Sequence, residues 1–208
     1  MNCLIDNRQW VKLSESPSAR VIIVAYEFYA NLVDHQDNKV MVQGKMVSFM
    51  SMAINAYYGI PDILEPDEYV TYARGIMDYD AVIDALYYLG SIWKNGELVS
   101  FRASQLLNPT QAWYYFMLAN VLPSRYASDV TKERAILLYT IIQGMTINIG
   151  RIIHSSMLQA ANRGHLGIWF PLLIIELCHG ASVIWVDTDP LVLPKGIIDD
   201  KFMRKFQT

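Results

Sequence analysis

The chain has 208 residues, 53% of them hydrophobic and 18% charged, with a net charge of -3. That length can bury a complete core without disulfides or metals, and the apolar share excludes an intrinsically disordered chain. The acidic balance argues against a domain that holds nucleic acid by electrostatic attraction alone. Cys3 and Cys178 lie far apart and form no paired motif, so neither a zinc site nor a disulfide framework is indicated.

The sequence predicts neither secretion nor membrane contact. The opening MNCLIDNRQW contains Asp6 and lacks an apolar signal core, so we expect an intracellular protein, cytoplasmic or nuclear. Residues 135–150 are apolar but too short for a membrane span, and residues 164–186 are interrupted by Pro171 and Glu176. Both stretches are therefore expected to be buried helices.

In chain order, the first predicted helix covers residues 16–33. Ser16 is a suitable N-cap, Pro17 suits the first helical position, and apolar residues then recur at steps of three and four. Residues 40–49 alternate around Gly44, and this pattern predicts a small β-hairpin.

Further elements are predicted where apolar runs lie between glycine and proline residues, which end helices and strands. Predicted helices cover residues 51–58, a short segment that ends near Arg74, and residues 80–89. Residues 97–107 are expected to hold a strand, and a further helix is predicted over residues 110–122, after Pro109.

A compact polar insert at residues 121–134 then separates two strongly apolar segments. We expect a corner between two helices here, in which Ser128 or Asp129 caps the second helix. Glu133 would lie in the first turn of that helix, where a carboxylate favours the positive end of the helix dipole.

No charged residue occurs from Ala135 to Gly150, which predicts one central buried helix. Gly144 and Gly150 would weaken this helix locally, and both suggest that a neighbouring helix approaches closely. The side chains expected to line its buried face are Leu138, Ile142, Met145 and Ile149.

Two acidic patterns could suggest metal-dependent chemistry, but each also has a structural interpretation. Asp187 and Asp189 follow an apolar run, as carboxylates that hold a divalent cation often do, yet Asp-Thr-Asp-Pro is also an ordinary turn. Asp80 and Asp84 share a helix face, and no convincing central strand precedes them or the Asp199-Asp200 pair. We therefore predict no metal site.

Cys178 could act as a nucleophile with His154 or His179 as the base. Adjacent residues on a helix point about 100° apart, which disfavours a pair made by Cys178 and His179. A small buried cysteine is the commoner state. We predict no catalytic residue, no cofactor and no enzymatic activity.

Basic residues at and near the polar insert could contact phosphate. Asp129 and Glu133 partly neutralise them, and the following helix is too apolar to lie in a DNA groove. Nucleic-acid binding is therefore expected to be weak. The candidate nucleic-acid-binding residues are Arg125, Lys132, Arg134, Arg151 and Arg163.

Four runs place aromatic residues side by side or nearly so: AYEFY, INAYYGI, ALYYLG and AWYYF. In such pairs one ring can face the core while its neighbour faces outward. In a chain of low charge, repeated pairs of this kind also suit an interaction surface. We expect self-association or binding to another protein, and we identify no small-molecule substrate.

Four blocks of the sequence occur in the order typical of one family. They are EFYANL (27–32), VQGKMVSF (42–49), LPSRYASDVTKERAILLYTIIQGMTINIGRII (122–153) and FPLLIIELC (170–178). Together they resemble the putative plant transposon protein domain family, which occurs in plant retroelement-derived reading frames. The resemblance covers about residues 20–183 and leaves residues 184–208 as a C-terminal extension. This chain has Tyr126 where the family often has a histidine.

The resemblance implies descent from a mobile element and assigns no catalytic residue. For the fold, we predict a mainly α protein: a single compact helical domain over residues 1–208 with a small β-hairpin near residues 40–49. For function, we expect a non-enzymatic structural or protein-interaction domain of a plant transposon- or retrotransposon-derived protein, Gag-like by analogy and self-associating. The alternative is a transposase-related fragment or a host-recruited factor that binds DNA or RNA.

Overall fold

The computed structural model describes residues 2–15, 20–21, 23–63, 66–75, 78–88, 101–124, 126–162, 168–185 and 191–192. Two compact units emerge: unit 1 is formed chiefly by Ile63–Ile147, and unit 2 by Ile5–Asp62 together with Asn148–Ile197. Two such units can still fold as one domain, so the single domain expected over residues 1–208 stays a prediction.

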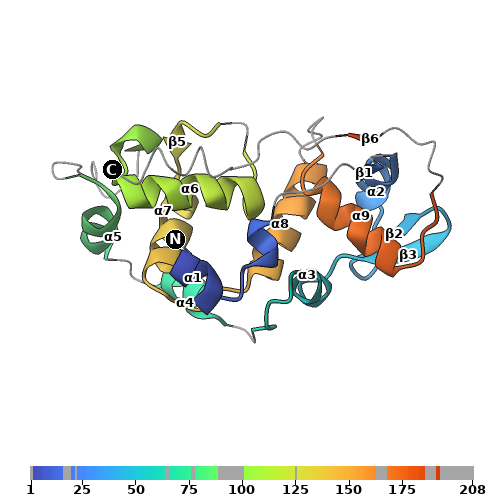
Figure 1. Ribbon diagram of the computed structural model, residues 1–208, viewed down its shortest axis with the longest axis horizontal. Coiled ribbons are helices and arrows are strands. Elements are labelled where there is room, and N and C mark those ends of the chain that lie inside the picture. Colours follow the sequence, from blue (N-terminus) through green and yellow to red (C-terminus); the bar gives the residue numbers. More distant parts are fainter. Residues whose placement is uncertain are drawn as a thin grey trace. The chain divides into compact units, whose positions relative to one another are not determined.

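The prediction of a mainly α protein with one small hairpin is confirmed (Figure 1). The chain opens with α1 (Asn2–Asn7) and the short 3-10 helix η1 (Lys12–Ser14). Unit 2 contains β1 (Arg20–Val21), α2 (Ile23–Leu32), β2 (Lys39–Val42), β3 (Lys45–Ser48), α3 (Ser51–Tyr58), α8 (Ile149–Asn162), α9 (Pro171–Gly180) and β6 (Leu191–Val192). Unit 1 contains α4 (Glu68–Arg74), α5 (Tyr79–Leu86), β4 (Phe101–Arg102), η2 (Ala103–Gln105), α6 (Asn108–Asn120), β5 (Asp129–Val130) and α7 (Lys132–Ile142).

The hairpin of unit 2 is built as its sequence predicts. β2 and β3 pair antiparallel, and Gln43 and Gly44 form the two-residue turn with φ of 45° and 73°. Positive φ at both central positions is the geometry of the turn that matches strand twist, and glycine adopts it without steric cost. Val40 and Val47 face each other on the buried side, against α2 and α9, which lie beside the hairpin in Figure 1.

Helices α3 and α8 of unit 2 pack at unusually close range, and Gly150 is the reason. A Cβ added to Gly150 would lie 2.2 Å from the backbone oxygen of Ser51 and 2.6 Å from Oδ1 of Asn55. No side chain larger than hydrogen fits there, so the prediction that Gly150 marks a close helix approach is confirmed.

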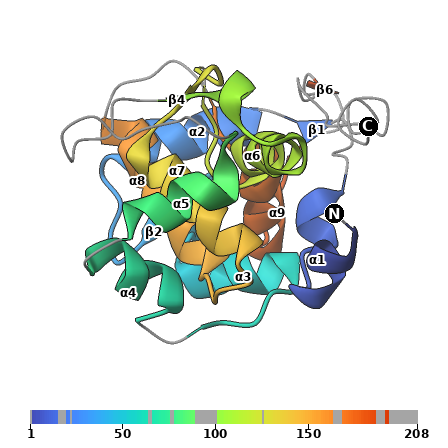
Figure 2. The same cartoon turned by 90° about the vertical axis from the view of Figure 1, so that its left-hand side faces the viewer.

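Unit 1 is organised around α7, which α4, α5 and α6 pack against (Figure 2). The helix is buried on most of its circumference because apolar residues occur at nearly every position after Arg134. The N-terminus of α4 is tied to the segment after α7: the backbone N–H of Glu68 donates to Oγ1 of Thr146, and the N–H of Thr146 donates to the Glu68 carboxylate.

The predicted central helix over residues 135–150 is wrong, because two helices occupy this stretch. Helix α7 ends at Ile142, and Gly144 adopts φ of 76°. The N–H of Gly144 bonds to the carbonyl of Ile141 and that of Met145 to the carbonyl of Thr140, the pattern of a Schellman helix end. Glycine therefore suits this position because of its positive φ. It is not needed for close packing, since a Cβ added to Gly144 would meet nothing within 4 Å.

The four side chains expected on one buried face are correspondingly divided. Leu138 on α7 and Ile149 on α8 are buried, whereas Ile142 and Met145 are only half-buried. The new helix begins after Asn148, whose side-chain oxygen accepts a hydrogen bond from the N–H of Arg151 at 3.1 Å. This is the capping geometry that starts a helix.

The first predicted helix begins later than expected. Arg20 and Val21 form strand β1, which pairs antiparallel with β6, and α2 starts only at Ile23. The apolar periodicity of residues 21–32 was compatible with a longer helix, but β-branched residues such as Val21 also favour an extended strand when a partner is available. Ser16 and Pro17 lie outside the described residues.

The remaining predicted boundaries are close to the observed ones. Helix α3 matches residues 51–58 and ends at Gly59 in the left-handed conformation, α4 ends at Arg74, and α6 begins beside Pro109. Helix α5 ends at Leu86, three residues before the predicted end, because Tyr87 pairs with Leu106 in a β-bridge. Within the described residues, none of the helices has the length and apolar character needed to span a membrane.

Candidate functional site

The polar insert of unit 1 is a folded loop that carries a short strand. Asp129 and Val130 form β5, which pairs antiparallel with β4 of the predicted strand region. The predicted helix cap is wrong: the N-cap of α7 is Thr131, which makes no side-chain capping bond, and Asp129 lies in the strand. The difference arises because Asp129 pairs with Arg102. The strand therefore extends to Val130, and only Thr131 lies between it and the first residue of α7.

Arg134 holds this loop in place from the first turn of α7. Its guanidinium donates to the backbone carbonyls of Tyr126 and Asp129 at 2.8 and 2.7 Å, and also to Oγ of Ser124. The hydroxyl of Tyr114 on α6 donates to the carbonyl of Asp129 at 2.9 Å, and Arg134 lies 3.4 Å from that hydroxyl. A cation that satisfies several carbonyls of its own loop is a structural element of that loop.

The five candidate nucleic-acid-binding residues are distributed over both units. Lys132 is exposed in the first turn of α7 and Arg134 is half-buried in its loop, both in unit 1. Arg151 is half-buried on α8 in unit 2, and Arg125 and Arg163 lie outside the described residues. Nucleic-acid binding by this set stays a prediction.

The acidic candidates show no assembled metal centre in the part of the chain that is described. Asp80 and Asp84 are both exposed on α5, as expected of a solvated helix face. No cluster of three or more histidine, cysteine, aspartate or glutamate side chains occurs among the described residues. The two acidic pairs at residues 187–189 and 199–200 lie outside that part of the chain.

Cys178 has the environment of a core residue. It is fully buried on α9, and burial raises the pKa of its thiol to about 12, so that the thiol is neutral near pH 7. A reactive cysteine needs a stabilised thiolate, and these surroundings have the opposite effect. His154 is engaged elsewhere, because its Nε2 lies 3.1 Å from Oδ1 of Asn38.

The largest accumulation of exposed apolar side chains belongs to unit 2. Of the eleven large hydrophobic side chains exposed in the described residues, nine belong to this unit and two, Tyr88 and Tyr126, to unit 1. The nine in unit 2 are Val11, Ile23, Tyr26, Val33, Met41, Met46, Met50, Met52 and Ile184.

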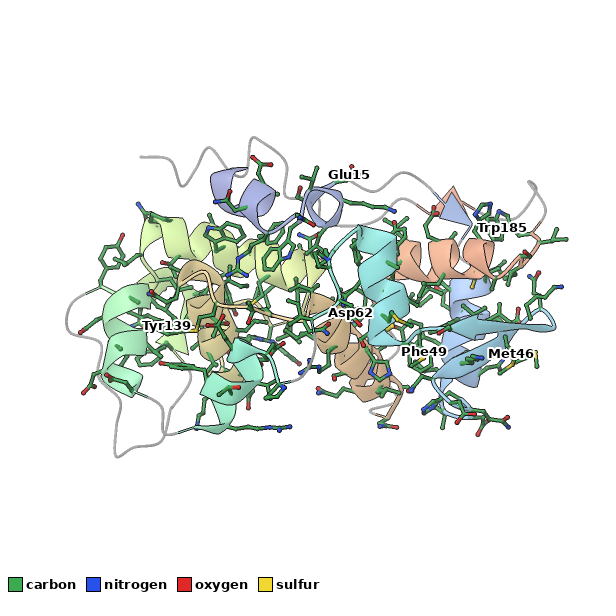
Figure 3. The ribbon with its side chains drawn as sticks, turned by 90° about the horizontal axis from the view of Figure 1, so that it is seen from below. Glu15, Met46, Phe49, Asp62, Tyr139 and Trp185 are labelled. Atoms are coloured by element: carbon green, nitrogen blue, oxygen red, sulfur yellow. The ribbon has the colours of Figure 1, made fainter. Side chains whose placement is uncertain are left out.

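Met41 and Met46 form a directly opposed pair on the solvent side of the hairpin, and we call them the methionine face. They are 48% and 42% exposed. Phe49 donates its N–H to the carbonyl of Asn38, and the alternation of an antiparallel ladder makes Met41 and Met46 a non-hydrogen-bonded pair. Side chains are closest in such pairs, so the two methionines lie next to each other on the exposed side of the hairpin. Figure 3 labels Met46 on the hairpin and Phe49 where the hairpin leads into α3.

The aromatic pairs divide between core and surface only in part as expected. Tyr87 is buried and its neighbour Tyr88 exposed, which follows the predicted alternation, and Tyr114 is buried beside half-buried Tyr115. The rings of Tyr57 and Tyr58 are both half-buried.

A buried amide network in unit 2 was missed by sequence analysis. Asn55 on α3 is 1% exposed, and its Oδ1 accepts the N–H of Gly150 at 2.7 Å. Its Nδ2 donates to Asn148 at 2.9 Å and to the Asp62 carboxylate at 3.0 Å. An asparagine within the apolar spacing of residues 51–58, together with the predicted close approach at Gly150, was the available signal.

The described residues form a mainly α-helical protein, and most of their exposed large apolar side chains belong to the hairpin-bearing unit. The family model described as a putative plant retrotransposon-related domain matches residues 6–184. The chain belongs to this family, which confirms the resemblance and extends it toward the N-terminus. Neither the curated proteins nor the solved structures include a match to the chain.

Proposed function

We propose that this chain is a non-enzymatic structural and protein-interaction domain of a plant retrotransposon-derived protein, with a Gag-like role, and that it self-associates through the methionine face of unit 2. The observation that carries the proposal is the concentration of exposed large apolar side chains in one unit, with Met41 and Met46 opposed on the hairpin. A second copy of the chain is the proposed partner.

The chemistry of this face suits protein association. Methionine side chains are flexible and polarizable, so they adapt to an opposing apolar surface. Part of the hairpin edge is already bonded to α2, since Nδ2 of Asn31 donates to the Met41 carbonyl at 2.8 Å and the Glu27 carboxylate accepts the N–H of Gln43 in the turn. The methionine side chains, rather than that strand edge, would therefore make the contact.

The role of Arg134 supports a protein partner over a nucleic acid. Its donors are directed at the carbonyls of its own loop, so binding phosphate would require those hydrogen bonds to break. The net charge of -3 also removes the counterion release that drives non-specific nucleic-acid binding.

The test is a double substitution, Met41→Gln with Met46→Gln, which keeps side-chain length and removes apolar character. The matched control is Tyr126→Ser, at a residue of unit 1 that is 75% exposed. We expect the double variant to raise the self-dissociation constant by about tenfold or more, as loss of central interface anchors does, and the control to leave it unchanged. Equal association of the wild-type chain and both variants in light scattering after gel filtration would refute the assigned surface.

A further inference from the structure

Both ends of the hairpin of unit 2 meet at one side chain of α8. The imidazole of His154 stacks on Phe49, with ring centroids 5.1 Å apart and an interplanar angle of 23°. Its Nε2 lies 3.1 Å from Oδ1 of Asn38. Asn38 immediately precedes β2 and Phe49 immediately follows β3, so a single ring joins the two chain ends of the hairpin to the helix.

Phe49 makes this contact part of the core. It is fully buried, and it packs edge-on against Phe28 of α2 with centroids 5.8 Å apart. A second histidine, His35, contacts Phe49 edge-on at 5.5 Å. Two titratable rings thus flank one buried phenyl ring.

The elements around His154 provide little compensation for a positive charge. Helix α8 contains no acidic residue and its one other cation is Arg151, α3 contains no charged residue, and the strands contribute Lys39 and Lys45. The acids of α2 and of the connection from α2 to β2 are Glu27, which accepts the N–H of Gln43, and Asp34 and Asp37, which are exposed. Burial, and secondarily the positive charge of His35, lower the pKa of His154 below its ordinary value of 6.5.

We propose that His154 is a pH-sensitive latch: the neutral ring fastens both ends of the hairpin to α8, and protonation loosens them. The cation would lose hydration in a half-buried site, and the positive charge of His35 would disfavour it further. Because the hairpin carries Met41 and Met46, the latch controls how firmly the methionine face is presented. The latch itself does not depend on that face binding a partner.

The direction of the pH effect follows from proton linkage. A histidine whose pKa is lower in the folded chain than in the unfolded chain binds more protons when unfolded. Its contribution to stability is complete above the unfolded pKa of 6.5 and decreases as the pH falls through that value toward the folded pKa. The hairpin should therefore be most firmly held at neutral and higher pH.

The first measurement follows the His154 ring by NMR in the intact wild-type chain. We expect a titration midpoint below 6.5. Amide protection should also fall at Val40 and Val47 of the hairpin on acidification, and should fall less at Leu137 and Leu138 of α7. A midpoint at or above 6.5, or an equal loss of protection in the hairpin and α7, overturns the proposal.

The second measurement compares urea unfolding midpoints at about pH 7.5 and about pH 5, on either side of an ordinary histidine pKa. His154→Gln should reduce the pH-dependent fall in midpoint by about half or more, whereas His179→Gln, at an exposed histidine of the same unit, should leave it as in wild type. Identical pH dependence in all three proteins contradicts the latch. If His154→Gln does not fold, the wild-type NMR titration decides the question, and neither result requires self-association.

Discussion

The two units use polar side chains for different purposes. In unit 1 a cation, Arg134, organises the polar loop before α7, and the helix behind it is almost wholly apolar. In unit 2 two buried amides, Asn55 and Asn148, organise the crossing of α3 and α8, and the surface retains most of the exposed large apolar side chains.

The charged insert and most of the exposed large apolar side chains of the described residues therefore belong to different units. The charged insert is the most conspicuous feature of the sequence, yet its half-buried arginine is directed at its own backbone. The hairpin of unit 2 has an ordinary sequence, but it exposes two opposed methionines. We therefore propose an interaction role for unit 2 and a structural role for the insert of unit 1.

The substitution that should destabilise the chain most tests whether α7 forms the core of unit 1. Leu138 is fully buried on this helix, and Leu138→Ala should lower the free energy of unfolding by about 2–5 kcal/mol through lost burial and a residual cavity. Ile142→Ala, at a half-buried residue of the same helix, should cost less than half as much. Urea unfolding of both variants provides the measurement, and a loss under about 0.5 kcal/mol for Leu138→Ala would make α7 peripheral.

The next effect concerns the helix crossing of unit 2. Gly150→Ala would place a methyl group 2.2 Å from the Ser51 backbone oxygen, so the helices must separate at a cost of about 1–3 kcal/mol or more. Gly180→Ala is the matched control, because a Cβ there meets nothing within 4 Å. The control should be neutral or slightly stabilising in thermal unfolding. Equal stability of the two variants would contradict the close α3–α8 packing.

A smaller effect distinguishes a structural arginine from a surface cation in unit 1. Arg134→Gln should lower the free energy of unfolding by about 1–2 kcal/mol, because carbonyls in the loop lose a charged donor. Lys132→Gln, two residues earlier and exposed, should change it by less than about 0.5 kcal/mol. If chemical denaturation gave the reverse order, the assignment of Arg134 to the loop would fail.

The smallest expected effect is a null result with divalent cations. The described residues contain no group of three or more histidine, cysteine, aspartate or glutamate side chains that could hold a metal ion, and we expect none at residues 187–189. Calorimetric titration with Mg²⁺ or Mn²⁺ should detect no site tighter than about millimolar, the weak end of protein affinities. Tight binding that disappears in Asp187→Ala would instead indicate metal-dependent chemistry.

Much of the fold could be predicted from sequence because the residues that start and end its helices and form its hairpin turn act locally. Gly59 ends α3 in a left-handed conformation, Pro109 starts α6, and the Gln43-Gly44 turn sets the hairpin register. Each of these signals acts through φ preferences of one or two residues, which a single sequence records. The same rule explains Gly150, whose missing side chain admits a neighbouring helix.

The errors arose where distant partners decide the local structure. Val21 and Asp129 fit a helix and a cap by local pattern, but pairing with Leu191 and Arg102 makes them strand residues. Gly144 could equally weaken a long helix or end a short one, and the Schellman bonds that follow it decide the matter. The partners of Asn55 and of His154 lie far away in the sequence, so local sequence patterns could predict neither network.

Sedimentation velocity of the wild-type chain at micromolar concentration, at low and at high salt and with and without single-stranded RNA, distinguishes self-association from nucleic-acid binding. We predict an oligomer whose dissociation constant changes little with salt, because burial of apolar surface is insensitive to ionic screening, and we predict little bound RNA. A strict monomer that binds the RNA more tightly than about a micromolar, with an affinity that falls steeply as salt is added, would contradict the proposed self-association.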